Sequence, residues 1–440
     1  MKSSIRWELE PKCNLNCKHC IVGRIDYSTF QVNTLDTYFN IIDRIKELGI
    51  THICFSTKEP LLNQYFFEIL EYCSSNNIWS SFITNGLLLN NSILFKLPTY
   101  KLKDIAISLE GWDEESVNKI RGKHFQRINK CLHDVNSFKN KNYQSVIQLN
   151  LTKDNIKKAS SFFSYFEQFS GFVITVGNLS PIGNAEINKD ICCSFKECFS
   201  FFHEIIKFKR NKLNNQYIFT FLPYSGTVFF NMVNKINQIP TLPSCSINNN
   251  GYTLYPNGDI CRCIILDDPN CHIDFNNNLG NIISNSPINL DLDVKSKYKT
   301  NRHILCKDCI NKKSCHICYA LTSSHNEKDF IESCSTFNNI LDKIIHLILG
   351  KKIKFSINKK ILLESSNSKY YVHRIYDTGL IKKEVDKTTF DFLNSHFFDS
   401  SYMIYSEKLI DNDLLRLCVY NDFLKIKGVN YNELLSYYFT

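Results

Sequence analysis

The sequence predicts an α/β protein: a partial barrel of six β-strand–α-helix units, then a cysteine-rich domain and a small α+β domain. Three observations predict this organisation. Short apolar segments alternate with amphipathic helical patterns as far as about residue 185, which is typical of parallel sheets with helical crossovers. Cysteines then concentrate between residues 245 and 334, and beyond about residue 351 strand-like segments precede helical ones. We therefore expect domains at 1–190, 245–345 and 346–440, with a mostly helical connector at 191–244.

The six expected strands are short and rich in β-branched and aromatic residues. They are Ile5–Leu9, His52–Phe55, Trp79–Thr84, Asp104–Leu109, Val146–Leu151 and Val173–Val176. Apolar residues at helical spacing mark the segments between them, chiefly Leu35–Leu48, Asn63–Cys73, Phe125–Phe138 and Asn155–Phe169. In such sheets the functional residues lie at the C-terminal ends of the strands, so we expect the site in the loops that follow them.

Length, charge and cysteine content restrict the class of protein. A chain of 440 residues is too long for one ordinary core. The net charge of +9 comes from scattered lysines, which suits an acidic peptide partner and does not indicate a nucleic-acid partner. No signal peptide precedes the first strand, and the apolar run Ile344–Leu349 is too short to cross a membrane, so we expect a cytoplasmic protein. In that reducing compartment, nineteen cysteines favour metal binding over disulfides.

The loop after the first strand contains Cys13, Cys17 and Cys20 in the pattern C-x3-C-x2-C. Three thiolates can hold a 4Fe–4S cube at three corners, which leaves one iron open for chemistry. A zinc site made of four cysteines usually pairs two C-x2-C hooks, and no second hook lies nearby. Three unrelated core thiols are the remaining alternative, which this spacing disfavours in a reducing cell.

This spacing resembles the signature of the radical S-adenosylmethionine (SAM) superfamily. The resemblance implies that Cys13, Cys17 and Cys20 are the catalytic cluster ligands and that the open iron chelates SAM. One electron from the cluster would then release a 5′-deoxyadenosyl radical. His19 occupies the position where the family usually has an aromatic residue against the adenine.

Loops after the next two predicted strands also resemble this family. The segment Phe55–Pro60 is similar to the Gly-Gly-Glu-Pro loop that receives the SAM amino group, with Glu59 in place. Thr57 and Lys58 replace the two glycines, a departure that matters because glycine lets backbone approach a ligand closely. Asn85 directly follows the third strand and precedes a glycine, as in the family. Without the resemblance, a Glu-Pro pair is as often the start of a helix as part of a ligand site, and an Asn-Gly pair indicates only a turn.

Three further segments resemble a block typical of radical SAM peptide maturases. Ser108–Gly111, Arg121-Gly122 and the Phe-Gln-Arg segment ending at Arg127 match its order. By resemblance, Ser108 and Arg127 would hold the SAM ribose or carboxylate, and the planar fork of an arginine suits a carboxylate. The alternative for Arg127 is an exposed helix charge. Gly183 lies in a segment similar to the family's Pro-x-Gly-x-Ala loop near the adenine.

The second cysteine group begins with a predicted β-hairpin. A Pro-Asn-Gly turn at 256–258 separates strand-like segments, and alternate positions would put Cys261 and Cys263 on one face. Two C-x2-C pairs follow five residues apart, which is a specific metal signal. The group resembles the SPASM extension, with two auxiliary 4Fe–4S clusters. The implied ligands are Cys306, Cys309, Cys315 and Cys334 for the outer cluster and Cys245, Cys263 and Cys318 for the inner, completed by Cys261, Cys271 or an open position. The C-x2-C spacing of the last pair departs from the family's three spacers, and two zinc ribbons would use the same spacings.

The C-terminal segment predicts a hairpin with a Thr-Gly turn at 378–379 and then a helix, Asp386–His396. Strands followed by helices suggest a small winged-helix-like unit. It faintly resembles a peptide-recognition element that binds a leader peptide as an added strand at its sheet edge. A simple structural cap is the alternative.

These features predict a radical SAM/SPASM enzyme that matures a ribosomally made precursor peptide carrying a leader. The implied cofactors are SAM and three 4Fe–4S clusters, and the implied electron source is a reductant such as flavodoxin or ferredoxin. We favour a thioether or carbon–carbon cross-link over epimerisation, because cross-linking needs an electron sink that auxiliary clusters supply. The alternatives are formylglycine formation in a sulfatase and a non-catalytic iron–sulfur or zinc scaffold, which the Thr57-Lys58 departure supports.

Overall fold

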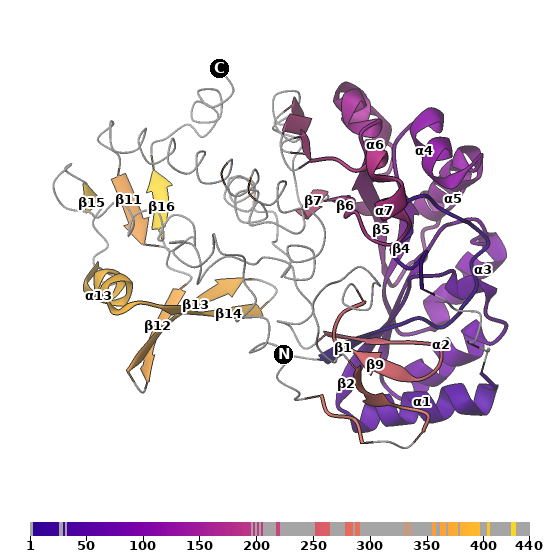
Figure 1. The fold of residues 1–440 in the computed structure, drawn as a ribbon, viewed down its shortest axis with the longest axis horizontal. Helices are drawn as coiled ribbons and strands as arrows, with labels where there is room; N and C mark the ends of the chain where they lie inside the picture. Colours follow the sequence, from indigo (N-terminus) through magenta and orange to yellow (C-terminus); the bar gives the residue numbers. More distant parts are fainter. Residues whose placement is uncertain are drawn as a thin grey trace. The chain divides into compact units, whose positions relative to one another are not determined.

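The chain forms two compact units, and each is described by itself. In this computed structural model the described residues are 3–25, 30, 33–194, 197–198, 200–201, 204–205, 217–220, 251–264, 278–284, 287–290, 331, 335, 354–357, 361–366, 368–376, 379–396, 403–404 and 424–427. Within them, the first unit contains a ten-stranded sheet with its helices, and the second contains two three-stranded sheets (Figure 1).

The large sheet has the strand order β10-β9-β8-β1-β2-β3-β4-β5-β6-β7. Six strands that are parallel neighbours in chain order correspond to the six predicted ones. They are β1 (Ser3–Trp7), β2 (Ile50–Phe55), β3 (Trp79–Thr84), β4 (Leu102–Leu109), β5 (Gln144–Leu151) and β6 (Phe172–Asn178). The loops after these strands therefore emerge at one edge of the sheet, and the predicted partial barrel of parallel units is confirmed.

Helices follow the strands as the sequence pattern predicts. The predicted segments form α1 (Leu35–Glu47), α2 (Phe66–Ser75), α5 (Phe125–Ser137) and the pair η3 (Asn155–Ser161) and α6 (Phe162–Phe166). Shorter elements that the sequence did not predict are η1 (Pro60–Leu62), α3 (Asn91–Lys96), η2 (Leu97–Thr99), α4 (Glu114–Arg121), α7 (Asn184–Ile187) and η4 (Lys189–Ile191). These elements are too short for apolar periodicity to reveal them.

Aromatic side chains fill the layer between the first strands and the helices. The ring centroids of Trp7 and Phe55 lie 5.7 Å apart, those of Phe55 and Phe66 5.8 Å, and those of Phe66 and Phe82 5.3 Å. All four side chains are fully buried. A one-residue shift in strand register would turn the strand rings away from the core. The packing therefore fixes the register of the strands, and with it the position of the loops that follow them.

Four further strands extend the sheet at its two ends. β7 (Tyr217–Thr220) is parallel to β6, so the predicted helical connector contributes a strand. β8 (Gly251–Leu254) pairs in parallel with β1 and, with β9 (Asp259–Cys261), forms the predicted hairpin. β10 (Asn278–Asn281) is antiparallel to β9. The first sheet thus continues past residue 245, and the domain boundaries of the sequence analysis stay predictions.

The second unit contains the predicted C-terminal hairpin and helix. β12 (Ile361–Ser366), β13 (Lys369–Tyr376) and β14 (Gly379–Val385) form an antiparallel sheet, and α13 (Lys387–His396) follows. Asp386 caps this helix by accepting a bond from the Thr389 backbone N–H at 2.7 Å. A separate sheet contains β11 (Lys354–Ile357), β15 (Met403–Ile404) and β16 (Leu424–Lys427). In the described parts of the chain, no helix is long and apolar enough to cross a membrane.

Candidate active site

The three-cysteine loop stands at the C-terminal end of β1, where the sequence places it. Cys13 is exposed, Cys17 is buried and Cys20 is half-buried, and none of them forms a disulfide. The Cys20 backbone N–H donates to the Cys17 carbonyl at 3.2 Å, which closes a turn between these two residues. The Lys18 backbone N–H donates to the Ile120 carbonyl at 3.0 Å. The middle of the loop is therefore anchored to α4.

Gly183 lets the loop after β6 pack directly against the cysteine loop. Its φ is +59°, and a Cβ atom there would lie 2.3 Å from the Cys20 carbonyl oxygen. The Asn184 backbone N–H donates to the same oxygen at 2.9 Å, and its side-chain amide donates to the Cys17 carbonyl at 3.0 Å. Position 183 therefore requires glycine because any side chain would collide with the backbone of the cysteine loop. The expected position of Gly183 near the adenine is not tested by this contact.

Asn85 and Glu59 link the ends of β2 and β3 to the same loop. The Asn85 side-chain amide lies 4.0 Å from Cys13 Sγ and donates to the Asn14 side-chain oxygen at 2.7 Å. The Glu59 carboxylate is fully buried and accepts bonds from the Asn85 backbone N–H at 2.8 Å and from the Thr84 hydroxyl at 2.9 Å. The structure therefore connects Glu59 to Cys13 through Asn85, at the strand ends where the sequence puts these residues, and their roles toward SAM stay predictions.

We expect Glu59 to give the protein a pH-dependent stability. Burial raises the pKa of Glu59 to about 7 from 4.5, although its hydrogen-bond donors oppose the shift. Between these values the folded state keeps a proton that the unfolded chain releases, so stability is lost as pH rises through this window. Relative to Glu59→Gln, the free energy of unfolding of the cluster-free protein should fall by about 3 kcal/mol from acid to neutral pH in urea titrations. The control, Glu68→Gln, removes an exposed carboxylate of α2 and should keep the pH dependence of the wild type. The same pH dependence in Glu59→Gln as in the wild type would contradict the assignment.

Thr57, which replaces a glycine of the family's loop, adopts a glycine-like backbone. Its φ is +86°, an outlying value for a β-branched residue. Thr57→Gly should raise the free energy of unfolding by about 1 kcal/mol, because relief of about 1–2 kcal/mol of strain exceeds the entropy that glycine costs. Urea titration measures this change. Thr57→Ala keeps a Cβ atom at the same φ, so an equal gain in that variant would show that the backbone is not the cause.

A buried ion pair lies behind the cysteine loop. Arg121 binds both carboxylate oxygens of Glu110, with Nη2 at 2.9 Å from Oε1, and both side chains are almost fully buried. His19 Nε2 lies 3.2 Å from the same Oε1, and Asn150 donates to it at 3.4 Å. Asn155 donates to the Glu110 carbonyl at 2.9 Å. Burial alone would raise the pKa of Glu110, but the charges of Arg121 and His19 hold it far below its usual range.

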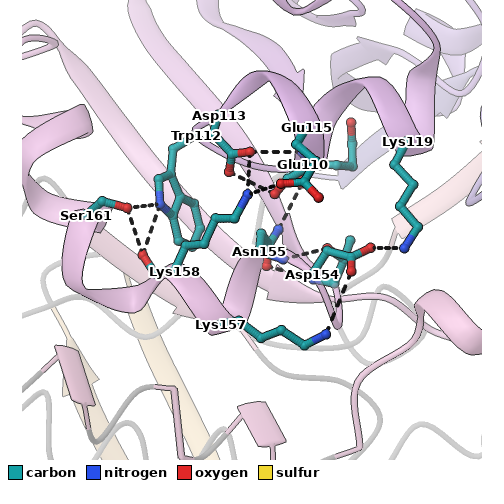
Figure 2. Close-up of polar contacts among 12 residues, drawn as sticks. Glu110, Trp112, Asp113, Glu115, Lys119, Asp154, Asn155, Lys157, Lys158 and Ser161 are labelled. Atoms are coloured by element: carbon teal, nitrogen blue, oxygen red, sulfur yellow. Dashed lines mark hydrogen bonds and ion pairs between the residues drawn. The ribbon is translucent and has the colours of Figure 1, made fainter.

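Charged side chains of α4, of η3 and of the residues that precede these helices form ion pairs between the segments that follow β4 and β5 (Figure 2). Lys158 Nζ lies 2.7 Å from Asp113 Oδ1 and 2.9 Å from Glu115 Oε2. Lys119 Nζ lies 2.6 Å from Asp154 Oδ2. Asp113 also caps α4 through the Ser116 backbone N–H at 3.0 Å. These contacts hold α4, and with it Arg121, in position beside the cysteine loop.

Ser108 and Arg127 are the side chains that the resemblance predicts to contact SAM. Ser108 is half-buried near the end of β4, and Arg127 is exposed in the first turn of α5. Their roles stay predictions. Glu110 and Arg121 belong to the maturase-like block, but the sequence alone did not predict a role for either of them. Their opposite charges, in two neighbouring segments of one predicted site, are the signal that could have predicted an ion pair.

The chemistry of the loop fits a 4Fe–4S cluster. Burial raises the pKa of Cys17 to about 12, opposed by the nearby Arg121 guanidinium, and burial likewise raises the pKa of Cys20, opposed by Lys58. Cysteine binds metal as the thiolate, and the nearby cations Arg121 and Lys58 compensate part of the negative charge that results. Among the described residues, no three His, Cys, Asp or Glu side chains converge as ligands of a single metal ion would. A cube instead takes each thiolate at a different iron.

Part of the second cysteine group packs on the cysteine loop. Cys261 is buried in an apolar cluster with Val22, Tyr255 and Ile264, and Cys20 packs against this cluster. Cys263 is half-buried. The other predicted ligands, Cys245, Cys271, Cys306, Cys309, Cys315, Cys318 and Cys334, lie outside the described residues. The auxiliary-cluster ligand sets therefore stay predictions.

Known proteins resemble the first unit in sequence. Residues 7–162 match the family model of the radical SAM superfamily. An AdoMet-dependent heme synthase of Methanosarcina barkeri is 25% identical over 206 residues, which are 46% of this chain and 58% of that protein. The mycofactocin maturase MftC of Mycolicibacterium smegmatis is 23% identical over 180 residues, 41% of this chain and 45% of that protein. The matched region thus spans about half the length of these curated relatives.

Solved structures share the fold. SuiB of Streptococcus suis bound to S-adenosylmethionine superposes with a TM-score of 0.57 over 73% of each chain, at 14% identity. Native anSMEcpe with bound AdoMet superposes with a TM-score of 0.53 over 78% of this chain and 100% of that one, at 19% identity. Likeness at this identity concerns the fold, and it agrees with the parallel sheet.

Proposed function

We propose, from the premise that residues 7–162 of this chain form a radical SAM domain, that the protein is an enzyme that uses SAM to modify a ribosomally made precursor peptide. The observation that carries the proposal is the cysteine loop, which backbone and amide contacts from the ends of β3 and β6 and from α4 hold at the site edge of the sheet. When bound there, a 4Fe–4S cluster would supply the electron that cleaves SAM to a 5′-deoxyadenosyl radical.

In this proposal the chain's own side chains hold and orient the cofactors. Cys13, Cys17 and Cys20 would ligate the cluster. Glu59 fixes the loop that faces the SAM amino group, and exposed Arg127 would pair with the SAM carboxylate. Holding SAM in one geometry beside one substrate C–H gives selectivity, because a radical reacts with whatever atom is closest.

Two kinds of observation support a peptide substrate. One relative is a maturase, and one neighbouring structure is SuiB bound to its precursor peptide SuiA. The net charge of +9 also suits an acidic peptide. We infer that the antiparallel sheet β12–β14 receives the leader of this peptide as an added strand, because β12 and β14 are its two outer strands in the described structure.

The second cysteine group would hold two auxiliary 4Fe–4S clusters and accept the electron left after a cross-link forms. The packing of Cys261 in the apolar group against which Cys20 also packs supports this proposal. An electron sink favours a thioether or carbon–carbon cross-link over epimerisation. We further infer that the protein acts in the cytoplasm, where its nineteen cysteines stay reduced.

Anaerobic reconstitution with iron and sulfide tests the proposal. With SAM and dithionite, the protein should release 5′-deoxyadenosine, and the variant with Cys13, Cys17 and Cys20 all changed to alanine should release none. Retention of the cluster and of this product by the triple variant would contradict the proposal.

The type of bond is tested by coexpression with a candidate precursor peptide, sought among short reading frames beside the gene. A cross-link lowers the peptide mass by two hydrogens, whereas epimerisation in deuterated water leaves the connectivity unchanged and exchanges one hydrogen. Formylglycine in a coexpressed sulfatase, with no change in the short peptide, would support that rival activity instead.

A further inference from the structure

We propose that the exposed surface formed by Lys18, Lys119, Ile187 and Lys189, the lysine–isoleucine patch, is the docking site of a small acidic one-electron carrier protein. The inference rests on the proposed function, because it concerns the electron that this function consumes. The carrier would be oxidised by one electron, and the cluster held by the adjacent cysteine loop would be reduced by it.

Backbone contacts gather the patch around the cysteine loop. The Lys18 backbone N–H donates to the Ile120 carbonyl at 3.0 Å, which places neighbouring Lys119 beside the loop. The Asn188 side-chain amide donates to the Lys18 carbonyl at 3.3 Å. This contact places the neighbouring residues Ile187 and Lys189 beside the loop as well. Lys18 directly follows Cys17 in the chain. A protein bound at this patch would therefore lie against the backbone of the cluster loop.

The apolar residue of the patch, Ile187, is not buried in the core of the protein. Ile187 is 74% exposed, the most exposed large apolar side chain in the described part of the chain. A single exposed apolar residue is ordinary, but this one lies on α7, which contacts the loop through Asn184 and Asn188. Electron-transfer complexes are small and transient, so one apolar contact with a charged rim is enough surface for such a partner.

The charge around Ile187 favours an acidic partner. Lys18 and Lys189 are exposed, and the side chain of Lys119 is 47% exposed. Two carboxylates near them are already paired: Asp154 with Lys119 and Lys157, and Glu186 with Arg24 (Figure 2 shows the Asp154 pairs). Asp190 and Glu115 are further acids that act on Lys119, and Glu115 is paired with Lys158. Among these side chains cations outnumber carboxylates, which steers an acidic protein to the patch.

The test measures binding and electron delivery separately on the reconstituted protein. Lys189→Glu and Ile187→Ser lie outside the cofactor-holding residues. Each should weaken binding of an acidic flavodoxin, measured by calorimetry at low salt, by about fivefold or more. Each should also lower flavodoxin-driven 5′-deoxyadenosine formation by a similar factor. Dithionite needs no docking surface, so the dithionite-driven rate and the iron content should stay at the wild-type level. The difference in binding between wild type and Lys189→Glu should shrink as salt is added.

Lys46→Glu is the matched control. Lys46 is exposed in the last turn of α1, which ends just before β2 begins and so stands at the opposite edge of the sheet. This variant should bind flavodoxin as the wild type does. Equal weakening by Lys46→Glu, an unchanged affinity in Lys189→Glu, or weaker binding of the precursor peptide in place of flavodoxin would each overturn the docking site. If the wild type binds flavodoxin through this patch but releases no 5′-deoxyadenosine with dithionite, the docking site stands and the proposed function fails.

Discussion

Replacing Glu110 with leucine should destabilise the cluster-free protein by about 3–5 kcal/mol, because the change leaves the Arg121 guanidinium buried without its carboxylate. The Glu110 side chain is fully buried and that of Arg121 is 5% exposed, so water cannot take over the lost interaction. His19 and Asn150 would lose a hydrogen-bond partner as well. Urea unfolding at neutral pH measures the loss.

Two comparisons separate the buried charge from other effects of this substitution. The double variant Glu110→Leu/Arg121→Met removes both charges and should be more stable than Glu110→Leu alone. The exposed pair Lys130–Asp134, with N and O atoms 2.6 Å apart, serves as the surface control. Asp134→Asn should cost no more than about 0.5 kcal/mol. If the double variant is no more stable than Glu110→Leu, the stranded charge is not the cause.

Gly183→Ala should strongly reduce the amount of iron that the protein retains after reconstitution. A Cβ atom at this position would lie 2.3 Å from the Cys20 carbonyl oxygen and 2.4 Å from that of Ile21. Both atoms belong to backbone, so the cysteine loop itself must move to make room. Iron and sulfide per chain, together with the visible absorbance of the cluster, measure the effect.

Gly49→Ala is the matched control for this substitution. Gly49 has a φ of +73°, but a Cβ atom there would meet nothing within 4 Å. It should therefore carry the conformational penalty of about 1–2 kcal/mol and keep its full iron content. Equal iron in the two variants would show that the contact between Gly183 and Cys20 does not hold the cluster loop.

Patterns within a few neighbouring residues predicted much of the fold. The six parallel strands and the longer helices follow from apolar periodicity, because each buries one regular face. The cysteine loop follows from spacing, since three thiols within eight residues after a strand lie in one loop. The hairpin of β8 and β9 follows from its Pro-Asn-Gly turn, where Gly258 has a φ of +88°.

Interactions between distant segments could not be predicted in the same way. Nothing in the local pattern of β8 indicates that it pairs in parallel with β1. Glu110, Arg121 and His19 are far from obvious partners in the sequence. They meet because α4 packs against the loop after β1. Gly183 was identified by its motif, yet the atom that excludes a side chain there belongs to a residue near the other end of the domain.

The pairing of β8 with β1 makes the N-terminal strand dependent on a segment translated much later. Residues Ser4–Trp7 align with Gly251–Leu254, and the Glu8 backbone N–H donates to the Leu254 carbonyl at 2.9 Å. Until the ribosome has released that segment, β1 remains an outer strand with unpaired peptide groups, which invites association with other chains. The thiol loop that follows β1 would gain its final support late in synthesis, so insertion of iron before the whole chain emerges would meet an incomplete site.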